Sequence, residues 1–286
     1  MLSEVYIVIY ILYNELSNKG KPLKVARKLE KKYSKKEKVV LINIITAKEN
    51  EKALLERVNE NDKVIILGGD GTIHQFFNHV EGTVPPCKVY FRSCGRGNDF
   101  ARDYKKNKVF EITHLFNKMP KAYVNGNEEI TFVNGVGMGV DAEVCLRQQS
   151  NTETKTKESY FKVALGAFKT FKPYTLDITI DGVEHHYEKV WLFVVNNGRC
   201  FGGGMKITPK AIREDDLLDI CIVHGIGIKK LITIFPSVIL GWHPIFKKYV
   251  KMFTGKHVIA NPSGCNLMQR DGEVTKEVNN LEVKRY

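Results

Sequence analysis

The sequence predicts an α/β domain built on a mostly parallel sheet over residues 1–123, followed by a β-rich domain over residues 124–286. Apolar, β-branched runs alternate with amphipathic helical patterns through the first domain, as in βαβ units with helices on both faces of a sheet. Strand-like runs dominate the remainder, which indicates a β-sandwich. In an alternative arrangement, the last strand of the chain returns to the first domain.

The first domain shows strand and helix patterns in strict alternation. Strands are expected at Val5–Tyr13, Val39–Ile45, Lys63–Leu67 and Lys88–Phe91. Helices are expected at Pro22–Tyr33 and Ile73–Val80, each with apolar residues on one stripe, and a short helix is expected at Glu51–Val58. This order predicts that the strands run mostly parallel.

The second domain is predicted mainly from short apolar runs. Strands are expected at Ile130–Asn134, Thr175–Ile180, Val190–Val195, Leu218–Val223, His257–Ala260 and Leu281–Arg285. Asp181-Gly182 is a hairpin-turn signal. Two lysine-rich apolar segments, Ser159–Phe171 and Ile228–Phe253, are expected to be helical, the second interrupted by Pro236 and Gly241.

Composition narrows the class of protein. With 43% hydrophobic and 27% charged residues, the chain can bury a sizeable core. No apolar run reaches the roughly 18 residues that a membrane span needs. The six cysteines form no CxxC pair, so reduced thiols in a cytoplasmic protein are expected. A net charge of +12 favours an anionic partner: a nucleic acid, an acidic membrane surface or a phosphorylated ligand.

Two glycine-rich turns each join a predicted strand to a helix. They are Gly68-Gly69-Asp70-Gly71-Thr72 and Gly95-Arg96-Gly97-Asn98-Asp99. Glycine lets a backbone approach phosphates closely, and the first N–H groups of a helix favour anions. A carboxylate in each turn suits Mg²⁺ bound with a nucleotide, although a tight turn with a capping role is the alternative for one such motif alone. Successive strand-to-helix turns of a parallel sheet lie at one edge, where ligands bind.

These turns resemble motifs of the diacylglycerol kinase catalytic family, which includes bacterial lipid kinases and sphingosine and ceramide kinases. Asp271-Gly272-Glu273 resembles the late Asp-Gly-Glu motif of that family. Further similarity lies in the early loop Asn14–Gly20, in Gly137–Ala142 and in the loop Asp215–Asp219. Each motif alone is weak, whereas the ordered set is specific and covers nearly the whole chain.

The resemblance implies a nucleotide-binding domain like that of NAD kinase and phosphofructokinase, a β-sandwich domain, and a site in the cleft between them. It also implies ATP and Mg²⁺ as cofactors. The residues implied to bind ATP are Asn14, Ser17, Thr46, Gly68, Gly69, Asp70, Gly71, Thr72, Arg96 and Asn98.

The resemblance also assigns the acidic residues. Asp70, Asp99 and Asp141 would form a network around Mg²⁺. Glu273 would be the general base and Asp271 would support it, with Asp70 as the alternative base. A structural Mg²⁺ is implied at a loop whose ligands would be Asp215 and backbone carbonyls at Ile212 and Leu217.

Three positions depart from the family pattern. Glu15 replaces a proline, Arg96 replaces a threonine that contacts the nucleotide, and Asp216 replaces a glycine of the metal loop. A guanidinium at Arg96 can contact phosphate directly. Aspartate adopts a positive φ less readily than glycine, so Asp216 puts the structural metal in doubt.

The expected reaction is transfer of the γ-phosphate of ATP to the hydroxyl of a membrane lipid, with diacylglycerol giving phosphatidic acid as the leading case. A sphingoid base, a prenol and a phosphatidylglycerol-type lipid stay open as acceptors. The lysine-rich segments suggest peripheral docking on an anionic membrane surface at the inner face of the membrane. No nucleic-acid partner is expected, and a homodimer stays open.

Two competing hypotheses remain. Another kinase of the same superfold, such as an NAD kinase or phosphofructokinase, shares the first glycine turn, but Asp99-Phe100-Ala101-Arg102 and the late Asp-Gly-Glu motif favour a lipid kinase. A non-catalytic basic protein that binds membranes or nucleic acids on this fold is less favoured, because Asp70, Asp99 and Glu273 are all present.

Overall fold

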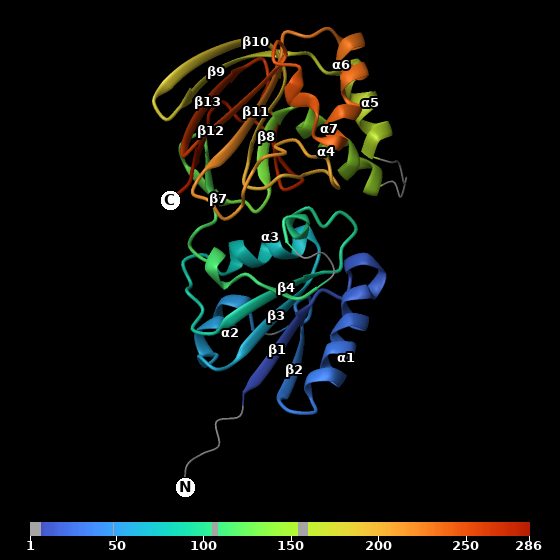
Figure 1. Cartoon of the computed structure of the whole chain (residues 1–286), viewed down its shortest axis with the longest axis vertical. Coiled ribbons are helices and arrows are strands. Elements are labelled where there is room, and N and C mark those ends of the chain that lie inside the picture. The colour runs from blue at the N-terminus through green and yellow to red at the C-terminus, as the bar shows by residue number, and fades with distance from the viewer. Residues whose placement is uncertain (1–6, 48, 105–107, 154–159) are drawn as a thin grey trace. The chain divides into compact units, whose positions relative to one another are not determined.

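The computed structural model describes residues 7–47, 49–104, 108–153 and 160–286. The chain divides into two compact units, Met1–Met119 and Pro120–Tyr286, and Figure 1 labels most of their helices and strands. The division falls four residues before the predicted boundary, since β6 (Lys121–Val124) pairs with β7 (Glu128–Thr131) in the second unit.

The last strand, β16 (Leu281–Lys284), pairs with β6 and with β13 (His257–Ser263). It therefore stays in the second unit, and the alternative that it returns to the first is wrong.

The first unit is a five-stranded sheet in the order β2-β1-β3-β4-β5, parallel except for the β4–β5 pair. Its strands are β1 (Val8–Tyr13), β2 (Lys38–Asn43), β3 (Lys63–Gly68), β4 (Lys88–Ser93) and β5 (Phe110–Glu111). Its helices are α1 (Lys21–Tyr33), α2 (Glu51–Arg57) and α3 (Asp70–His79), with 3₁₀ turns at Ser17–Gly20, Phe100–Arg102 and Thr113–Leu115. The predicted alternating order is confirmed.

The strand order explains where a ligand site can form in the first unit. The chain steps from β1 to β2 on one side, then crosses back to β3 and continues to β4. Right-handed crossovers therefore place α1 on one face of the sheet, and α2 and α3 on the other. The direction reverses between β1 and β3, and ligands of such sheets bind beyond the carboxyl ends of strands at this switch point.

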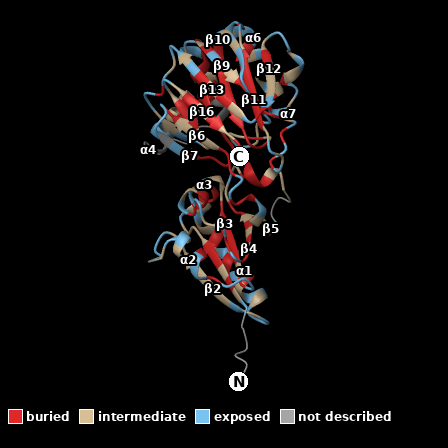
Figure 2. Ribbon diagram, turned by 90° about the vertical axis from the view of Figure 1, so that its left-hand side faces the viewer, coloured by how far each residue is buried: buried red, intermediate tan, exposed pale blue. Residues whose placement is uncertain are grey.

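The second unit is an 11-stranded antiparallel sheet folded into a sandwich, as predicted. Its strands run in the order β15-β14-β8-β10-β9-β13-β16-β6-β7, while β11 pairs with β10 and β12. The remaining bounds are β8 (Gly135–Gly139), β9 (Tyr174–Ile180), β10 (Val183–Asn196), β11 (Leu218–His224), β12 (Val250–Gly255), β14 (Met268–Arg270) and β15 (Glu273–Thr275). The core includes Phe132, Leu176 and Phe193, and Figure 2 shows buried residues along the strands of both units.

A layer of helices covers part of this sandwich and encloses a second apolar core around Trp191. The helices are α4 (Val140–Glu153), α5 (Tyr160–Thr170), α6 (Ile228–Ile234) and α7 (Pro236–Leu240), with a 3₁₀ turn at His243–Ile245. The prediction of one interrupted helix over Ile228–Phe253 is wrong at its end. Gly241, at φ 78°, ends α7, and the chain from Val250 forms β12.

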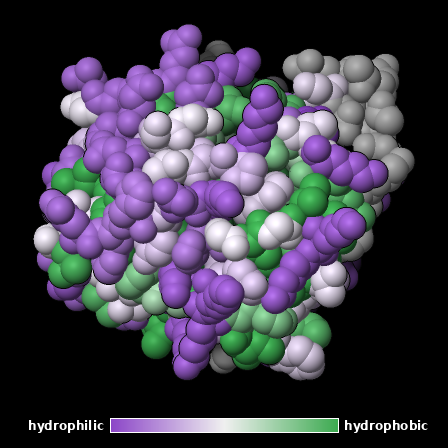
Figure 3. All heavy atoms as spheres, turned by 90° about the horizontal axis from the view of Figure 1, so that it is seen from above, coloured by the Kyte–Doolittle hydropathy of each residue, from purple (hydrophilic) through white to green (hydrophobic). Residues whose placement is uncertain are grey.

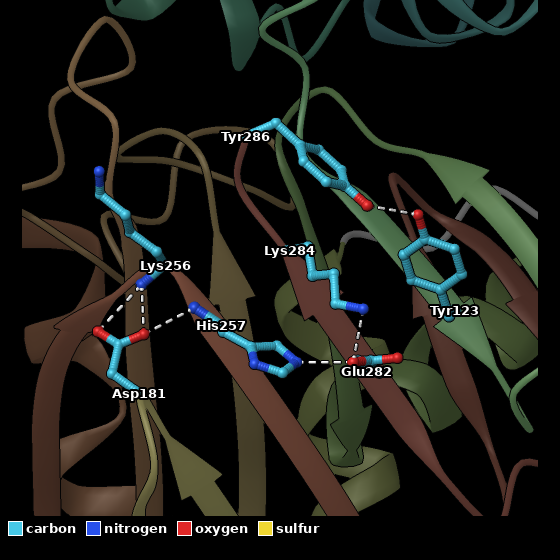
Figure 4. A network of polar contacts seen from close by, with 7 residues as sticks. All are labelled: Tyr123, Asp181, Lys256, His257, Glu282, Lys284 and Tyr286. Carbon is cyan, nitrogen blue, oxygen red and sulfur yellow. Dashed lines mark hydrogen bonds and ion pairs between the residues drawn. The ribbon is translucent and has the colours of Figure 1, made fainter.

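The predicted Asp181-Gly182 turn is confirmed and joins β9 to β10. Both residues have positive φ, 47° and 83°, as a tight hairpin requires. The Asp181 carboxylate also accepts hydrogen bonds from the backbone N–H groups of Lys256 and His257, at 2.9 and 2.8 Å. Figure 4 shows these hydrogen bonds beside the 2.6 Å contact between the His257 ring and Glu282, which links β13 to β16.

Within the described ranges, every helix is too short or too polar to cross a lipid bilayer.

Candidate active site

The two glycine turns of the first unit lie directly against each other. The backbone N–H of Cys94 donates to the Gly68 carbonyl at 2.6 Å. A Cβ added to Gly95 would lie 2.6 Å from the Cα of Gly69, and one added to Gly68 would lie 2.3 Å from the Cβ of Thr72. Such distances leave no room for any side chain, so the glycines are required by the close approach of the two turns.

A side-chain bond also joins the turns. The Asp70 carboxylate accepts a hydrogen bond from the backbone N–H of Phe100 at 2.9 Å. Asp99 immediately precedes Phe100, is buried, and forms an ion pair with Arg102 at 3.3 Å. Both acidic residues of the glycine turns therefore stand at the same edge of the sheet.

The early loop meets the second glycine turn as well. Asn14 closes the loop, since its side-chain oxygen accepts the N–H groups of Leu16 and Ser17 at 3.0 and 3.2 Å. The Asn18 side chain donates to the Cys94 carbonyl at 2.7 Å. Sequence reasoning named Asn14 and Ser17 but missed Asn18. Its backbone is left-handed, at φ 43°, and the sequence signal available was an asparagine in a loop, since asparagine tolerates this conformation better than most residues.

The other residues expected to bind ATP lie around these loops. Arg96 is exposed at the tip of the second turn, and Thr46 is exposed in the turn after β2. Asn98 is buried at φ 55° and donates to the Gly95 carbonyl at 2.9 Å, so it shapes the turn. Thr72 does not cap α3, because Gly69 occupies the N-cap position. The first N–H groups of α3, from Asp70 to Thr72, have no partner within the helix.

Asp271 and Glu273 belong to the second unit and have different surroundings. The Asp271 carboxylate accepts the backbone N–H groups of Val133, Asn134 and Gly135, at 2.6, 2.7 and 3.1 Å. It therefore fixes the chain that enters β8. Glu273 begins β15 with an exposed side chain and bonds to Arg270 at 2.8 Å.

Asp141 is buried at the start of α4, also in the second unit. Burial raises the pKa of this carboxyl to about 7, although hydrogen bonds from the Ala142 backbone and from Gln269 oppose the shift. The Gln269 side chain donates to it at 3.2 Å. Of the three expected network members, Asp70 and Asp99 lie in the first unit and Asp141 in the second.

The first unit has two carboxylates near its glycine turns that could hold Mg²⁺, Asp70 and Asp99. No group of three or more His, Cys, Asp or Glu side chains suited to a metal occurs in the part of the chain that the structure describes. Mg²⁺ with a nucleotide usually takes only one or two carboxylates, because phosphate oxygens and water complete its shell. Asp70 and Asp99 fit that donor set.

The loop expected to hold a structural Mg²⁺ has its own internal bonds. The Ile212 carbonyl accepts the Asp215 N–H at 3.1 Å, and the Asp215 carboxylate accepts the Leu217 N–H at 3.0 Å. The buried Arg285 guanidinium donates to the carbonyls of Arg213 and Asp215, at 2.8 and 2.6 Å. Arg285 therefore supports this loop through the carbonyls of Arg213 and Asp215, whereas the predicted carbonyl ligands are those of Ile212 and Leu217, so the structural Mg²⁺ stays a prediction.

Comparison with known proteins agrees with this architecture. Residues 8–124 match the family described as the diacylglycerol kinase catalytic domain, and residues 134–283 match the YegS C-terminal NAD kinase beta sandwich-like domain. A Bacillus subtilis (strain 168) protein named "Putative lipid kinase YtlR" is 28% identical over 230 residues, covering 74% of each chain.

A Mycobacterium tuberculosis (strain ATCC 25618 / H37Rv) protein named "Diacylglycerol kinase" is 28% identical over 200 residues, covering 64% of this chain and 61% of the relative. The solved structure of a diacylglycerol kinase from Bacillus anthracis str. Sterne has the same fold. Its TM-score is 0.64 at 16% identity, and the alignment covers 98% of this chain and 95% of that one. The chain therefore belongs to the diacylglycerol kinase catalytic-domain family, with a second domain of the YegS β-sandwich type.

Proposed function

We propose that this protein is an ATP-dependent lipid kinase that transfers the γ-phosphate of ATP to a lipid hydroxyl, with diacylglycerol giving phosphatidic acid as the leading case. Membership of a kinase family supports the reaction class. The observation that carries the choice of a lipid is an apolar cavity in the second unit with a single carboxyl group in its wall.

The loops of the first unit supply the groups that a nucleotide triphosphate needs. The N-terminal N–H groups of α3 and the exposed guanidinium of Arg96 would bind phosphate oxygens. Asp70 and Asp99 would hold Mg²⁺, which neutralises phosphate charge when it is bound. Asp70 is also fixed in place by its bond to Phe100, so its carboxylate needs little reorganisation.

The apolar cavity lies between the helical layer and the sandwich. The space inside it that a water-sized molecule can reach is about 60 Å³. Its lining includes Val144 of α4, Phe168 of α5, Trp191 of β10 and Leu231 of α6. Each methylene of a lipid chain buried there would contribute about 0.8 kcal/mol, whereas a nucleotide or sugar would lose hydration without compensation.

Asp141 is the one acidic residue of this wall, so it is the natural polar partner for a lipid headgroup. A carboxyl with a pKa of about 7 can either donate or accept a hydrogen bond to a hydroxyl near neutral pH. We assign it to lipid positioning. Glu273 is proposed as the general base that accepts the hydroxyl proton, and Asp70 remains the competing candidate.

The proposed setting is the cytoplasm, with peripheral docking on the inner face of an anionic membrane. All six cysteines are free and five are buried, which agrees with a reducing compartment. The net charge of +12 favours an anionic surface.

A panel of lipids in mixed micelles, offered with γ-labelled ATP, tests this function. Diacylglycerol, a sphingoid base, a prenol and phosphatidylglycerol should be compared. Ala164→Leu, which fills the cavity from α5, should lower kcat/KM for long-chain lipid by about ten-fold or more, since it removes space for roughly two methylenes. Lys169→Ala on the same helix is the matched control. Labelling of no lipid, or equal activity of Ala164→Leu, would exclude the proposed role of the cavity.

A further inference from the structure

An exposed apolar ridge stands on the second unit. It consists of Ile239, Leu240, Trp242 and Ile245, whose exposed fractions are 47%, 52%, 61% and 70%. These four make up a large share of the bulky hydrophobic residues exposed in the described chain, yet they occupy one seven-residue segment. Scattered apolar residues are normal on a surface, whereas such a cluster marks an interaction site.

The ridge is held rigidly from beneath. The Lys206 N–H donates to the Val238 carbonyl at 3.0 Å, and the buried His243 ring contacts the Ile207 carbonyl at 2.9 Å. Gly241 packs so closely that an added Cβ would lie 2.9 Å from the Cβ of Pro209. The apolar side chains are therefore exposed by a fixed backbone.

The sequence on either side of the ridge is rich in lysine and contains no acidic residue. From Ile220 to Arg270 the chain contains no aspartate or glutamate. The exposed lysines of the neighbouring segments are Lys206, Lys210, Lys229, Lys230, Lys247 and Lys248. Lys230 and Lys248 both lie over the ring of Tyr249, at 4.5 and 5.6 Å, which joins the segments before and after the ridge. Figure 3 shows one face of the molecule, on which hydrophilic side chains lie between smaller hydrophobic areas.

The ridge shares its backbone with the wall of the apolar cavity. Val238 and His243 line the cavity, while their neighbours Ile239, Leu240 and Trp242 face outward. One short segment therefore has a side toward the space proposed for the lipid and a side toward solvent.

We propose that this apolar ridge inserts into the interfacial region of an anionic phospholipid bilayer, with the surrounding lysines on the lipid headgroups. The partner follows from the chemistry: tryptophan and aliphatic side chains partition into the interface, and each nearby lysine adds attraction to anionic lipid. The inference rests on the proposed function, because insertion of the ridge brings the cavity wall to the membrane that contains the lipid substrate.

Binding to sucrose-loaded vesicles tests the ridge without ATP or turnover. Vesicles of phosphatidylcholine with about one third phosphatidylglycerol should sediment the wild-type protein, and salt should weaken the binding. Trp242→Ser/Ile245→Ser should weaken it by about ten-fold or more, since apolar burial contributes to interfacial affinity. Val84→Ser/Val183→Ser, which changes two exposed valines elsewhere, is the matched control.

A second measurement detects insertion directly. Lipids brominated near the headgroup should quench the fluorescence of exposed Trp242, whereas Trp191 is buried in the protein. Equal vesicle binding by the ridge variant, or no quenching, would overturn the proposal. So would concentration-dependent self-association that Trp242→Ser abolishes, because the ridge would then be an interface between copies. Vesicle binding with no labelling of any lipid would instead contradict the proposed function alone.

Discussion

The Asp70 carboxylate is fixed by the backbone N–H of Phe100, 2.9 Å away on the next strand-to-helix turn. This bond joins the two glycine motifs, in which Gly69 and Gly95 lie 26 positions apart in the sequence and meet without side chains between them. An asparagine at position 70 can still accept this bond through its side-chain oxygen. The charge of Asp70 and its structural role can therefore be separated by experiment.

Arg96 is expected to act on the nucleotide. Arg96→Ala should raise the KM for ATP by about ten-fold or more, because a charge-assisted hydrogen bond contributes about 1.5–3 kcal/mol, and it should leave the KM for lipid nearly unchanged. Arg96→Thr, which restores the residue that the family resemblance implies, should be milder. Steady-state kinetics on both variants checks this, with exposed Lys28→Ala on α1 as control. An unchanged KM for ATP in both would place the guanidinium outside the site.

Asp141 should make stability depend on pH. Its pKa is about 7 in the folded chain and 3.8 when unperturbed, so between these values the folded state holds one proton more. The free energy of unfolding should therefore fall as pH rises through this range and be lowest above about pH 7. Asp141→Asn should reduce that slope by up to about 1.4 kcal/mol per pH unit.

Urea unfolding from pH 5 to pH 8 measures this effect. Asp219 also has a pKa of about 7, raised by burial and by Asp215, so Asp219→Asn is the matched comparison and the double variant should be flatter still. Identical slopes for wild type and Asp141→Asn would show that the buried carboxyl is ionised.

Arg285 is expected to take the structural role that a divalent cation would have in the loop from Ile212 to Leu217. Arg285→Met should lower the free energy of unfolding by about 3 kcal/mol or more, because it leaves buried carbonyls of Arg213 and Asp215 without a charged donor. Lys284→Met, one position earlier, is the control. For the wild type, EDTA should leave Tm unchanged; a fall of several degrees would instead reveal a structural metal.

Glu273 is expected to accept the lipid hydroxyl proton. Glu273→Gln keeps the size of the side chain and should lower kcat by about 10² to 10⁴, with little change in ATP affinity. Single-turnover labelling measures the chemical step, and Glu277→Gln, another exposed residue nearby, is the control. If the variant keeps more than about a tenth of the wild-type rate, the base lies elsewhere and Asp70 becomes the leading candidate.

Periodicity was sufficient to predict the four parallel strands and the three helices of the first unit, because those strands are apolar, but it missed the two-residue strand β5. It failed at β8 and α4, where Gly135, Gly137 and Gly139 interrupt the pattern of a strand. Close contacts explain two of these glycines: an added Cβ at Gly137 would lie 2.2 Å from the Asp141 carboxylate of α4, and one at Gly139 would lie 2.5 Å from the Trp191 carbonyl of β10.

The surroundings of the site residues were less predictable. The Asp271 carboxylate binds three N–H groups of the segment from Val133 to Gly135, which lies more than 130 residues away in the sequence. Arg285 likewise reaches a distant loop. Such contacts depend on strand pairing across the second unit, which local patterns do not encode.

Transfer of label from γ-labelled ATP to lipid, compared between wild type and Asp70→Asn, tests the central claim most directly. Both proteins should show the same thermal unfolding, because asparagine can keep the bond to Phe100. The wild type should label diacylglycerol or one of the other lipids in mixed micelles. Asp70→Asn should be slower by about 10² or more, since phosphoryl transfer depends on positioned charge. Near-equal labelling by the two proteins, or none by the wild type with any lipid, would contradict the account.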